Sequence, residues 1–220
     1  MNILVRGRDL QIDEFQLKFG RRDGLEYDKD NTFDKGFSKF EIVFDFFLDE
    51  TPENLDQYVG NENLIVFCNS VKTSLAEFSF YLDHKVDFTM VGFNGMPSFL
   101  NRELMEITVL NEEDRELVGK VCSQLDTKYV IVEDRVGMVT PRVICMIINE
   151  AYYTVQEGTA EKKSIDLAMK LGTNYPYGPF EWASRIGIRN VYELLEAVQE
   201  DTKDERYKIC PTLKREYMLS

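Results

Sequence analysis

"INEAYYTVQEGTAEKKSIDLAMKLGTNYPYGPFEWASRIG", residues 148–187, decides the fold of the second half of the chain. Within it, "AEKKSIDLAMKLG" predicts a helix that starts after Thr159 and stops at Gly172, because glycine commonly ends helices. Gly178-Pro179 predicts the next helix start, where the missing proline N–H costs nothing. No strand-like run interrupts these signals, so we expect an all-helical segment.

The helical pattern extends on both sides of this stretch, whereas the first part of the chain has a different period. From Val136 onward apolar residues recur at helix spacing, and "NVYE" predicts another helix start, with Asn190 and Glu193 as a capping box. Earlier in the chain, short runs rich in β-branched and aromatic residues are bounded by turn signals and predict strands. These runs are NILVRG (2–7), EIVFDFF (41–47), NLIVFCN (63–69), FTMVGFN (88–94), LMEITVL (104–110) and KYVIVED (128–134).

Polar segments between these runs, such as DRELVGKVCSQL (114–125), can form helices. The alternation predicts an α/β sheet with largely buried strands. We therefore expect an α/β domain over residues 1–134 and an all-α domain over residues 135–220, with the boundary near residues 133–137.

Composition narrows the possible partners and the cellular location. The 220 residues are 44% hydrophobic and 12% aromatic, which is enough for a substantial core. The net charge of −13 disfavours nucleic acid and anionic lipid surfaces as partners. No apolar run approaches the roughly 20 residues that span a bilayer. The four cysteines form no Cys-x-x-Cys pair, and no apolar N-terminal segment suggests secretion, so we expect a cytoplasmic protein with reduced thiols.

The quoted stretch resembles the C-terminal domain of the 3-hydroxyacyl-CoA dehydrogenases. That family's pattern has an Asn-Glu-Ala helix, a glycine turn, an IDxAMKLG helix and a PxGPxEL turn, and residues 149–182 follow this order. The resemblance implies a helical domain of the 6-phosphogluconate dehydrogenase C-terminal-like type. In the family this domain forms a homodimer and closes over the acyl chain, so a homodimer and an acyl-CoA ligand are the implied partners.

The first half resembles the NAD-binding domain of the same family, in a truncated form. EIVFDFFLD (41–49) is similar to the family's DLVIEAVxE, with Asp45 and Asp49 at the two acidic positions. NLIVFCNSVKTSLAE (63–77) is similar to the next strand and its ASNTSSL turn, where Ser70 is the expected substrate contact. The implied fold is a truncated Rossmann-like sheet.

The stretch TMVGFNGMPS (89–98) resembles the family's HFFNPVP, and Val91 stands at the catalytic histidine. In the family this histidine takes the 3-hydroxyl proton while hydride leaves for the nicotinamide, and a glutamate on the next strand orients it. Here Glu106 matches the glutamate and Asn94 a substrate-binding position, but valine cannot accept a proton. Glu106 would then be vestigial. Pro141 stands at a family asparagine that holds the substrate carbonyl, so a second catalytic group is missing.

The cofactor fingerprint is also incomplete. A dinucleotide-binding turn needs Gly-x-Gly-x-x-Gly after the first strand, and only Gly7 remains, with Asp9 and Ile12 at the other glycine positions. A carboxylate near the phosphates costs on the order of 1 kcal/mol or more. Asp28 can imitate the ribose-binding acid after the second strand, and Asp49 is the remaining candidate for cofactor contact. About a dozen residues then replace a helix pair and a strand of the family.

Substitutes for the missing groups are not evident. The only histidine, His84, lies seven positions before Val91, roughly 23 Å away in an extended chain and on the opposite face. We expect it on the surface. The sequence has no cluster with metal-ligand spacing, so no metal site is expected.

Three functions remain open. The first is a 3-hydroxyacyl-CoA dehydrogenase homologue that has lost NAD and dehydrogenase activity but binds acyl-CoA or a partner, a pseudoenzyme. The second is an active oxidoreductase of fatty-acid or butanoate metabolism that uses NAD in a remodelled site. The third is an adaptor or structural subunit. Joint loss of cofactor and proton-transfer groups favours the first.

Overall fold

The computed structural model describes residues 1–34, 36–82 and 86–220, and His84 lies outside the described residues. The chain forms two compact units, Met1–Met138 and Val139–Ser220. In the described part of the chain, every helix is too short or too polar to cross a bilayer. The four cysteines are buried free thiols.

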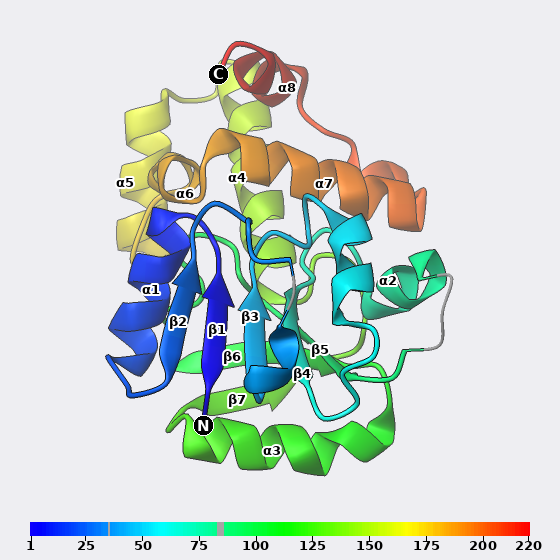
Figure 1. The fold of residues 1–220 in the computed structure, drawn as a ribbon. Helices are drawn as coiled ribbons and strands as arrows, with labels where there is room; N and C mark the ends of the chain where they lie inside the picture. The colour runs from blue at the N-terminus through cyan, green and yellow to red at the C-terminus, as the bar shows by residue number, and fades with distance from the viewer. Residues whose placement is uncertain (35, 83–85) are drawn as a thin grey trace. The chain divides into compact units, whose positions relative to one another are not determined.

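The N-terminal unit is built on a sheet of seven strands in the order β2-β1-β3-β4-β5-β6-β7 (Figure 1). β2, β1, β3, β4 and β5 are parallel, β6 runs antiparallel to β5, and β7 is parallel to β6. The strands are β1 Ile3–Arg6, β2 Leu25–Asp28, β3 Ile42–Asp45, β4 Ile65–Asn69, β5 Thr89–Phe93, β6 Leu104–Val109 and β7 Lys128–Ile131. All six strands predicted from the sequence are confirmed. The last of them, β7, is largely exposed rather than buried.

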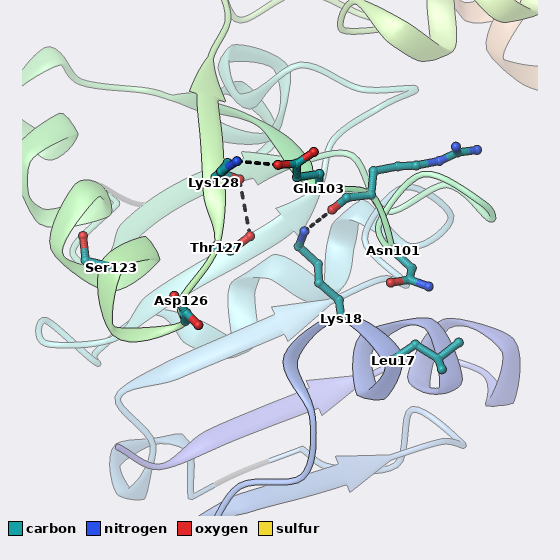
Figure 2. A pocket seen from close by; sticks show the side chains of 9 residues that line it. Leu17, Lys18, Asn101, Glu103, Ser123, Asp126, Thr127 and Lys128 are labelled. Carbon is teal, nitrogen blue, oxygen red and sulfur yellow. Dashed lines mark hydrogen bonds and ion pairs between the residues drawn. The ribbon is translucent and has the colours of Figure 1, made fainter. Parts of the chain in front are cut away.

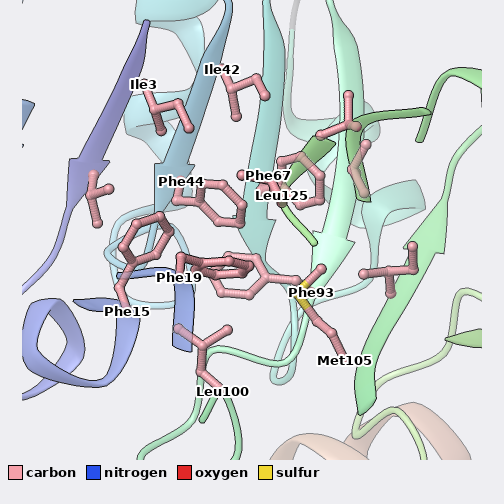
Figure 3. Close-up of a cluster of buried hydrophobic side chains, with 14 of the residues drawn as sticks. Ile3, Phe15, Phe19, Ile42, Phe44, Phe67, Phe93, Leu100, Met105 and Leu125 are labelled. Carbon is pink, nitrogen blue, oxygen red and sulfur yellow. The ribbon is translucent and has the colours of Figure 1, made fainter. Parts of the chain in front are cut away.

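Each face of this sheet packs against its own layer. On one face, α1 (Asp9–Phe19) and α3 (Arg115–Gln124) cover a core centred on Phe44, Phe67 and Phe93 (Figure 3). On the other face, α2 (Leu75–Tyr81) packs with the 3₁₀ segments η1 (Phe37–Lys39) and η2 (Pro52–Tyr58). A further 3₁₀ turn, η3 (Glu112–Asp114), leads into α3. Between β2 and β3, η1 is the one helical element among the described residues, so this half of the sheet is short as predicted.

The C-terminal unit is helical, as predicted. Its elements are α4 Thr140–Gln156, α5 Lys162–Thr173, α6 Pro179–Ile186, α7 Ile188–Thr202, η4 Glu205–Tyr207 and α8 Pro211–Met218. Asn149 on α4 fixes the approach to α8, since its amide donates to the Lys208 carbonyl and accepts from the Cys210 N–H, both at 2.9 Å. The buried asparagine thus replaces backbone partners that the turn before α8 lacks.

The turn before α6 explains why glycine stands at position 178. The Asp166 carboxylate of α5 accepts from the Phe180 N–H at 2.8 Å and so caps α6. A Cβ on Gly178 would lie 2.2 Å from the same carboxylate oxygen. Lys170 and Glu181 close the turn with an ion pair of 2.5 Å. The IDxAMK and GPxE motifs are therefore two halves of one helix junction.

One predicted helix start is wrong. Asn190 lies inside α7 rather than at its N-cap, because α6 ends at Gly187 in a left-handed conformation (φ 87°) and α7 begins immediately afterwards. The Asn190 amide instead donates to the Ile186 carbonyl at 2.9 Å, one of the last carbonyls of α6.

Candidate functional site at the carboxyl end of the sheet

A buried arginine occupies the carboxyl end of β1. Arg6 is 1% exposed and engages all of its side-chain nitrogens. Nε lies 3.1 Å from Asp28 Oδ2, and Nη1 lies 3.1 Å from Asp45 Oδ2. Its remaining partners are the Tyr58 hydroxyl, Asn31 Oδ1 and the Phe33 carbonyl. We call Arg6, Asp28, Asn31, Asp45 and Tyr58 the Arg6 cluster.

The cluster places one cation, Arg6, between two buried carboxylates, Asp28 and Asp45. Burial opposes the charge of Arg6, but Tyr58 and Asp45 outweigh burial and raise the pKa of the guanidinium. Burial and Asp45 also raise the pKa of the Tyr58 hydroxyl well above its usual value, which keeps it a donor to Asp45 at 2.6 Å. Burial raises the pKa of Asp45 as well, against the pull of Arg6. The cluster ties β1, β2, β3 and η2 together.

Both carboxylate oxygens of Asp28, a predicted cofactor contact, accept hydrogen bonds from other residues of the chain. Oδ2 accepts from Arg6 and from the Phe33 N–H at 3.1 Å, and Oδ1 accepts from the Thr32 N–H at 3.0 Å. Burial works against the charged form, but these hydrogen bonds outweigh it and lower the pKa of Asp28. A ribose hydroxyl would have to displace a backbone or guanidinium partner to reach this carboxylate.

The crevice between β1 and β3 is filled by a phenyl ring. Phe46, directly after β3, is 1% exposed. Its ring carbons lie 3.0 Å from the ideal Cβ position of Gly7 and 2.9 Å from that of Gly95. Phe46 stands where the family pattern DLVIEAVxE has alanine. The ring therefore takes space above Gly7 at the point where an α/β sheet with this strand order binds ligands.

Charged side chains next to Gly7 and Phe47 pair with one another. Arg8, which precedes α1, makes two hydrogen bonds of 2.7 Å to the Glu50 carboxylate after β3 and lies over the Phe47 ring. Asp9 at the start of α1 forms an ion pair with Lys29. Asp9 thus places a carboxylate in the first turn of α1.

The residues at this edge do not fit a dinucleotide. Pyrophosphate binding needs close backbone approach at the first turn and an N-terminal helix dipole free of carboxylates. Here Phe46 covers Gly7, Asp9 stands at the helix start, and the ribose-binding acid is paired with Arg6. We therefore derive no hydride transfer through this crevice.

A second set of buried polar side chains lies at the end of β4 and on β6. Ser70, Thr108 and Glu106 are at most 8% exposed, and Gly92 of β5 lies beside the first two. A Cβ on Gly92 would lie 2.2 Å from Ser70 Oγ and 2.4 Å from Thr108 Cγ2. Both hydroxyl oxygens are buried and meet no hydrogen-bond partner among the described residues. Such hydroxyls are available to a carbonyl oxygen or to a water molecule.

The structure does not bring Val91 and Glu106 to one face of the sheet. Val91 is fully buried in the core with Phe93, and on β6 Met105 and Ile107 join the same core. Glu106, between them, therefore points to the opposite face. The β5 positions on that face are Met90, which is packed in the other core, and Gly92, where no side chain fits. Neither position on β5 can present a proton-transfer group to Glu106.

The remaining predicted residues have local partners. The Asn94 N–H donates to the Glu106 carbonyl at 3.2 Å, and Asn94 Oδ1 accepts from the Met96 N–H at 3.4 Å, so Asn94 shapes the turn after β5. Asp49 Oδ1 accepts from the Lys72 N–H at 3.1 Å, while Oδ2 is buried with no partner among the described residues. Burial raises the pKa of Asp49 to about 7 against the opposing effect of Lys72.

Pro141 lies in the first turn of α4 in the C-terminal unit. A helix needs no backbone N–H donor at this position, so the missing N–H of proline costs nothing there. No group of three or more histidine, cysteine, aspartate or glutamate side chains in residues 1–34, 36–82 and 86–220 could hold a metal ion.

The sequence contained two signals for the filled crevice that motif reasoning did not use. One is an arginine at the end of the apolar run ILVR, directly before Gly7. The other is phenylalanine at Phe46, in place of the small residue of the family pattern. Thr108 carried no recognisable signal, because threonine is an ordinary strand residue.

Comparisons with known proteins match the C-terminal unit most closely. Residues 137–218 match the family "3-hydroxyacyl-CoA dehydrogenase, C-terminal domain". The 3-hydroxyadipyl-CoA dehydrogenase of Escherichia coli K12 is 42% identical over 88 residues, which is 40% of this chain and 18% of the relative. The probable 3-hydroxybutyryl-CoA dehydrogenase of Bacillus subtilis 168 is 34% identical over 122 residues, 56% of this chain and 42% of the relative. The chain thus matches less than half the length of these relatives.

Solved structures extend the similarity of fold to nearly the whole chain. FadB2 of M. tuberculosis has a TM-score of 0.78 at 16% identity, over 99% of this chain and 93% of that one. (S)-3-hydroxybutyryl-CoA dehydrogenase PaaH1 of Ralstonia eutropha has a TM-score of 0.73 at 20% identity, over 98% and 93%. Residues 137–218 thus belong to the 3-hydroxyacyl-CoA dehydrogenase family as its C-terminal domain, and the chain shares the fold of these solved structures.

Proposed function

We propose that this chain is a 3-hydroxyacyl-CoA dehydrogenase homologue that does not carry out NAD-dependent dehydrogenation and that binds an acyl-CoA thioester. The observation that carries the first part is the filled crevice: Phe46 packs on Gly7, and Arg6 holds Asp28. The absence of a proton-transfer group on β5 supports it independently, since both Val91 and Gly92 are unsuitable.

The second part rests on what the chain retains. The relatives that it matches are named for CoA esters of 3-hydroxy acids. The buried hydroxyls of Ser70 and Thr108 remain without partners among the described residues, and they can donate to a thioester or 3-keto oxygen. Four buried free thiols fit a reduced, cytoplasmic setting.

Calorimetric titration with NADH and, separately, with acetoacetyl-CoA tests both parts. We expect no heat of binding with NADH up to millimolar concentration and saturable heat with acetoacetyl-CoA that weakens in Ser70→Ala. The Bacillus subtilis relative, assayed in parallel, controls for ligand quality. Saturable NADH binding would instead support an active dehydrogenase with a remodelled site. No heat of binding with either ligand would favour an adaptor that binds another protein.

We also propose that the chain forms a homodimer through its C-terminal helices. α5 has no buried residue in the single chain, and it exposes Leu167 and Leu171 to 56% and 79%. Leu171→Glu should convert the dimer to a monomer in sedimentation experiments. Leu17→Glu, on an equally exposed leucine of α1, should leave the dimer intact. A wild-type chain that sediments as a monomer at micromolar concentration contradicts the proposal.

A further inference from the structure

A cavity of about 660 Å³ lies in the N-terminal unit, apart from the residues that fill the crevice (Figure 2). Its walls come from the second half of α1, from the end of the loop between β5 and β6, and from the turn between α3 and β7. The lining residues include Leu17, Lys18, Arg102, Glu103, Asp126 and Lys128. None of them has been used by the site described above.

Lys18 is the unusual side chain of this cavity. It is half-buried, and its Nζ donates to the Arg102 carbonyl at 2.5 Å. A dashed line from Lys18 marks this hydrogen bond in Figure 2. It forms no ion pair with a carboxylate among the described residues, and Glu103, which also lines the cavity, pairs with Lys128. Other lysines do pair with carboxylates: Lys29, Lys39, Lys120, Lys128, Lys162, Lys170 and Lys203.

The surroundings of Lys18 make its protonated form less favourable than that of a lysine in water. Burial lowers the pKa of Lys18, and the Cys122 thiol of α3 acts in the opposite direction. The other charged groups that line the cavity are Arg102, Glu103, Asp126 and Lys128, which carry no net negative charge together. A desolvated lysine amine is a nucleophile toward carbonyl carbon.

We propose that Lys18 is the preferred acylation site of this chain, with small acyl thioesters that enter the adjoining cavity as donors. The Nζ lone pair attacks the thioester carbonyl, the C–N bond forms as the C–S bond breaks, and the thiolate leaves with the proton that the amine loses. The step needs no oxidant or cofactor. It does not depend on the acyl-CoA binding proposed above, since any thioester that fits the cavity suffices.

The test uses the full chain and S-acetyl-N-acetylcysteamine at pH 8, with peptide mass spectrometry to follow each lysine. Lys120 is the internal control, because it is exposed on α3 and paired with Glu116. We expect Lys18 to acetylate at least about threefold faster than Lys120. Equal or slower acetylation of Lys18 overturns the proposal.

A second comparison separates cavity access from general reactivity. Leu17 lines the cavity and is 71% exposed, whereas Leu10 is 55% exposed on the same helix and does not line it. Leu17→Trp should slow acetylation of Lys18 and leave Lys120 unchanged, while Leu10→Trp should change neither. If both variants keep the wild-type rate at Lys18, the cavity is not the route and the proposal is wrong.

Discussion

A ring carbon of Phe46 lies 3.0 Å from the position that a Cβ on Gly7 would take, so the glycine that resembles the first glycine of a phosphate-binding turn accommodates a phenyl ring here. Gly7 thus matches the family pattern, but its contact in this structure is with Phe46. Glycine at position 7 permits close packing with the chain's own side chain rather than with a pyrophosphate.

Gly7→Ala should destabilise the protein through this contact. The new methyl group would crowd both Phe46 and Gln11 Cβ, at 3.0 and 3.2 Å, and we expect a loss of about 1–3 kcal/mol in the free energy of unfolding by urea. The loss should shrink when the same substitution is made in a Phe46→Leu background. Gly119→Ala is the control, because its Cβ would meet only the hydroxyl end of Tyr129. Equal costs of Gly7→Ala in both backgrounds contradict the proposed contact.

Much of the fold follows from the sequence, and much of the site does not. The six strands and the helix starts at Gly178-Pro179 are set by local periodicity and turn chemistry, which a single sequence displays. The sheet face on which Val91 or Glu106 lies depends on the register of β5 and β6, and matching sequence motifs does not reveal this register. The Arg6 cluster joins residues up to 52 positions apart, so its pairing appears only once the chain is folded.

The Arg6 cluster should contribute strongly to stability. Arg6→Met removes the cation and leaves Asp28 and Asp45 buried without it, so we expect a loss of about 3–5 kcal/mol in urea unfolding. Arg8→Met is the matched control, since its partner Glu50 and Arg8 itself are solvent-exposed, and its cost should stay within about 1 kcal/mol. If the two variants lose similar amounts of unfolding free energy, the buried cluster does not stabilise β1, β2 and β3 more than a surface ion pair does.

The junction of α5 and α6 offers a test within the C-terminal unit. Gly178→Ala forces the Asp166 side chain away from the Phe180 N–H, and the lost cap together with crowding should cost about 1–3 kcal/mol. The same substitution in an Asp166→Gly background should cost less by at least about 0.5 kcal/mol, because the crowding atoms are gone. Gly172→Ala, whose Cβ would meet no atom within 4 Å, controls for the glycine change itself. Additive costs in the double variant would rule out this account of the turn before α6.

Asp49 should give stability a pH dependence of known sign. Its pKa is raised to about 7 by burial, compared with about 3.9 in an unfolded chain, so the folded state binds more protons between these values. The contribution of Asp49 to the free energy of unfolding is therefore full below pH 4 and is lost as the pH rises to 7, by at most about 4 kcal/mol.

Asp49→Asn should remove this dependence, since an amide does not titrate. We expect the difference in urea-unfolding free energy, variant minus wild type, to rise steadily from pH 4 to pH 7 and then level off. Glu14, whose pKa burial raises, and Asp28 are present in both proteins, so their effects cancel in the difference. Asp13→Asn, at an exposed position, controls for the loss of one negative charge. Parallel curves for wild type and Asp49→Asn would mean that the Asp49 carboxylate titrates alike in the folded and unfolded chain, and that its buried Oδ2 is solvated in solution.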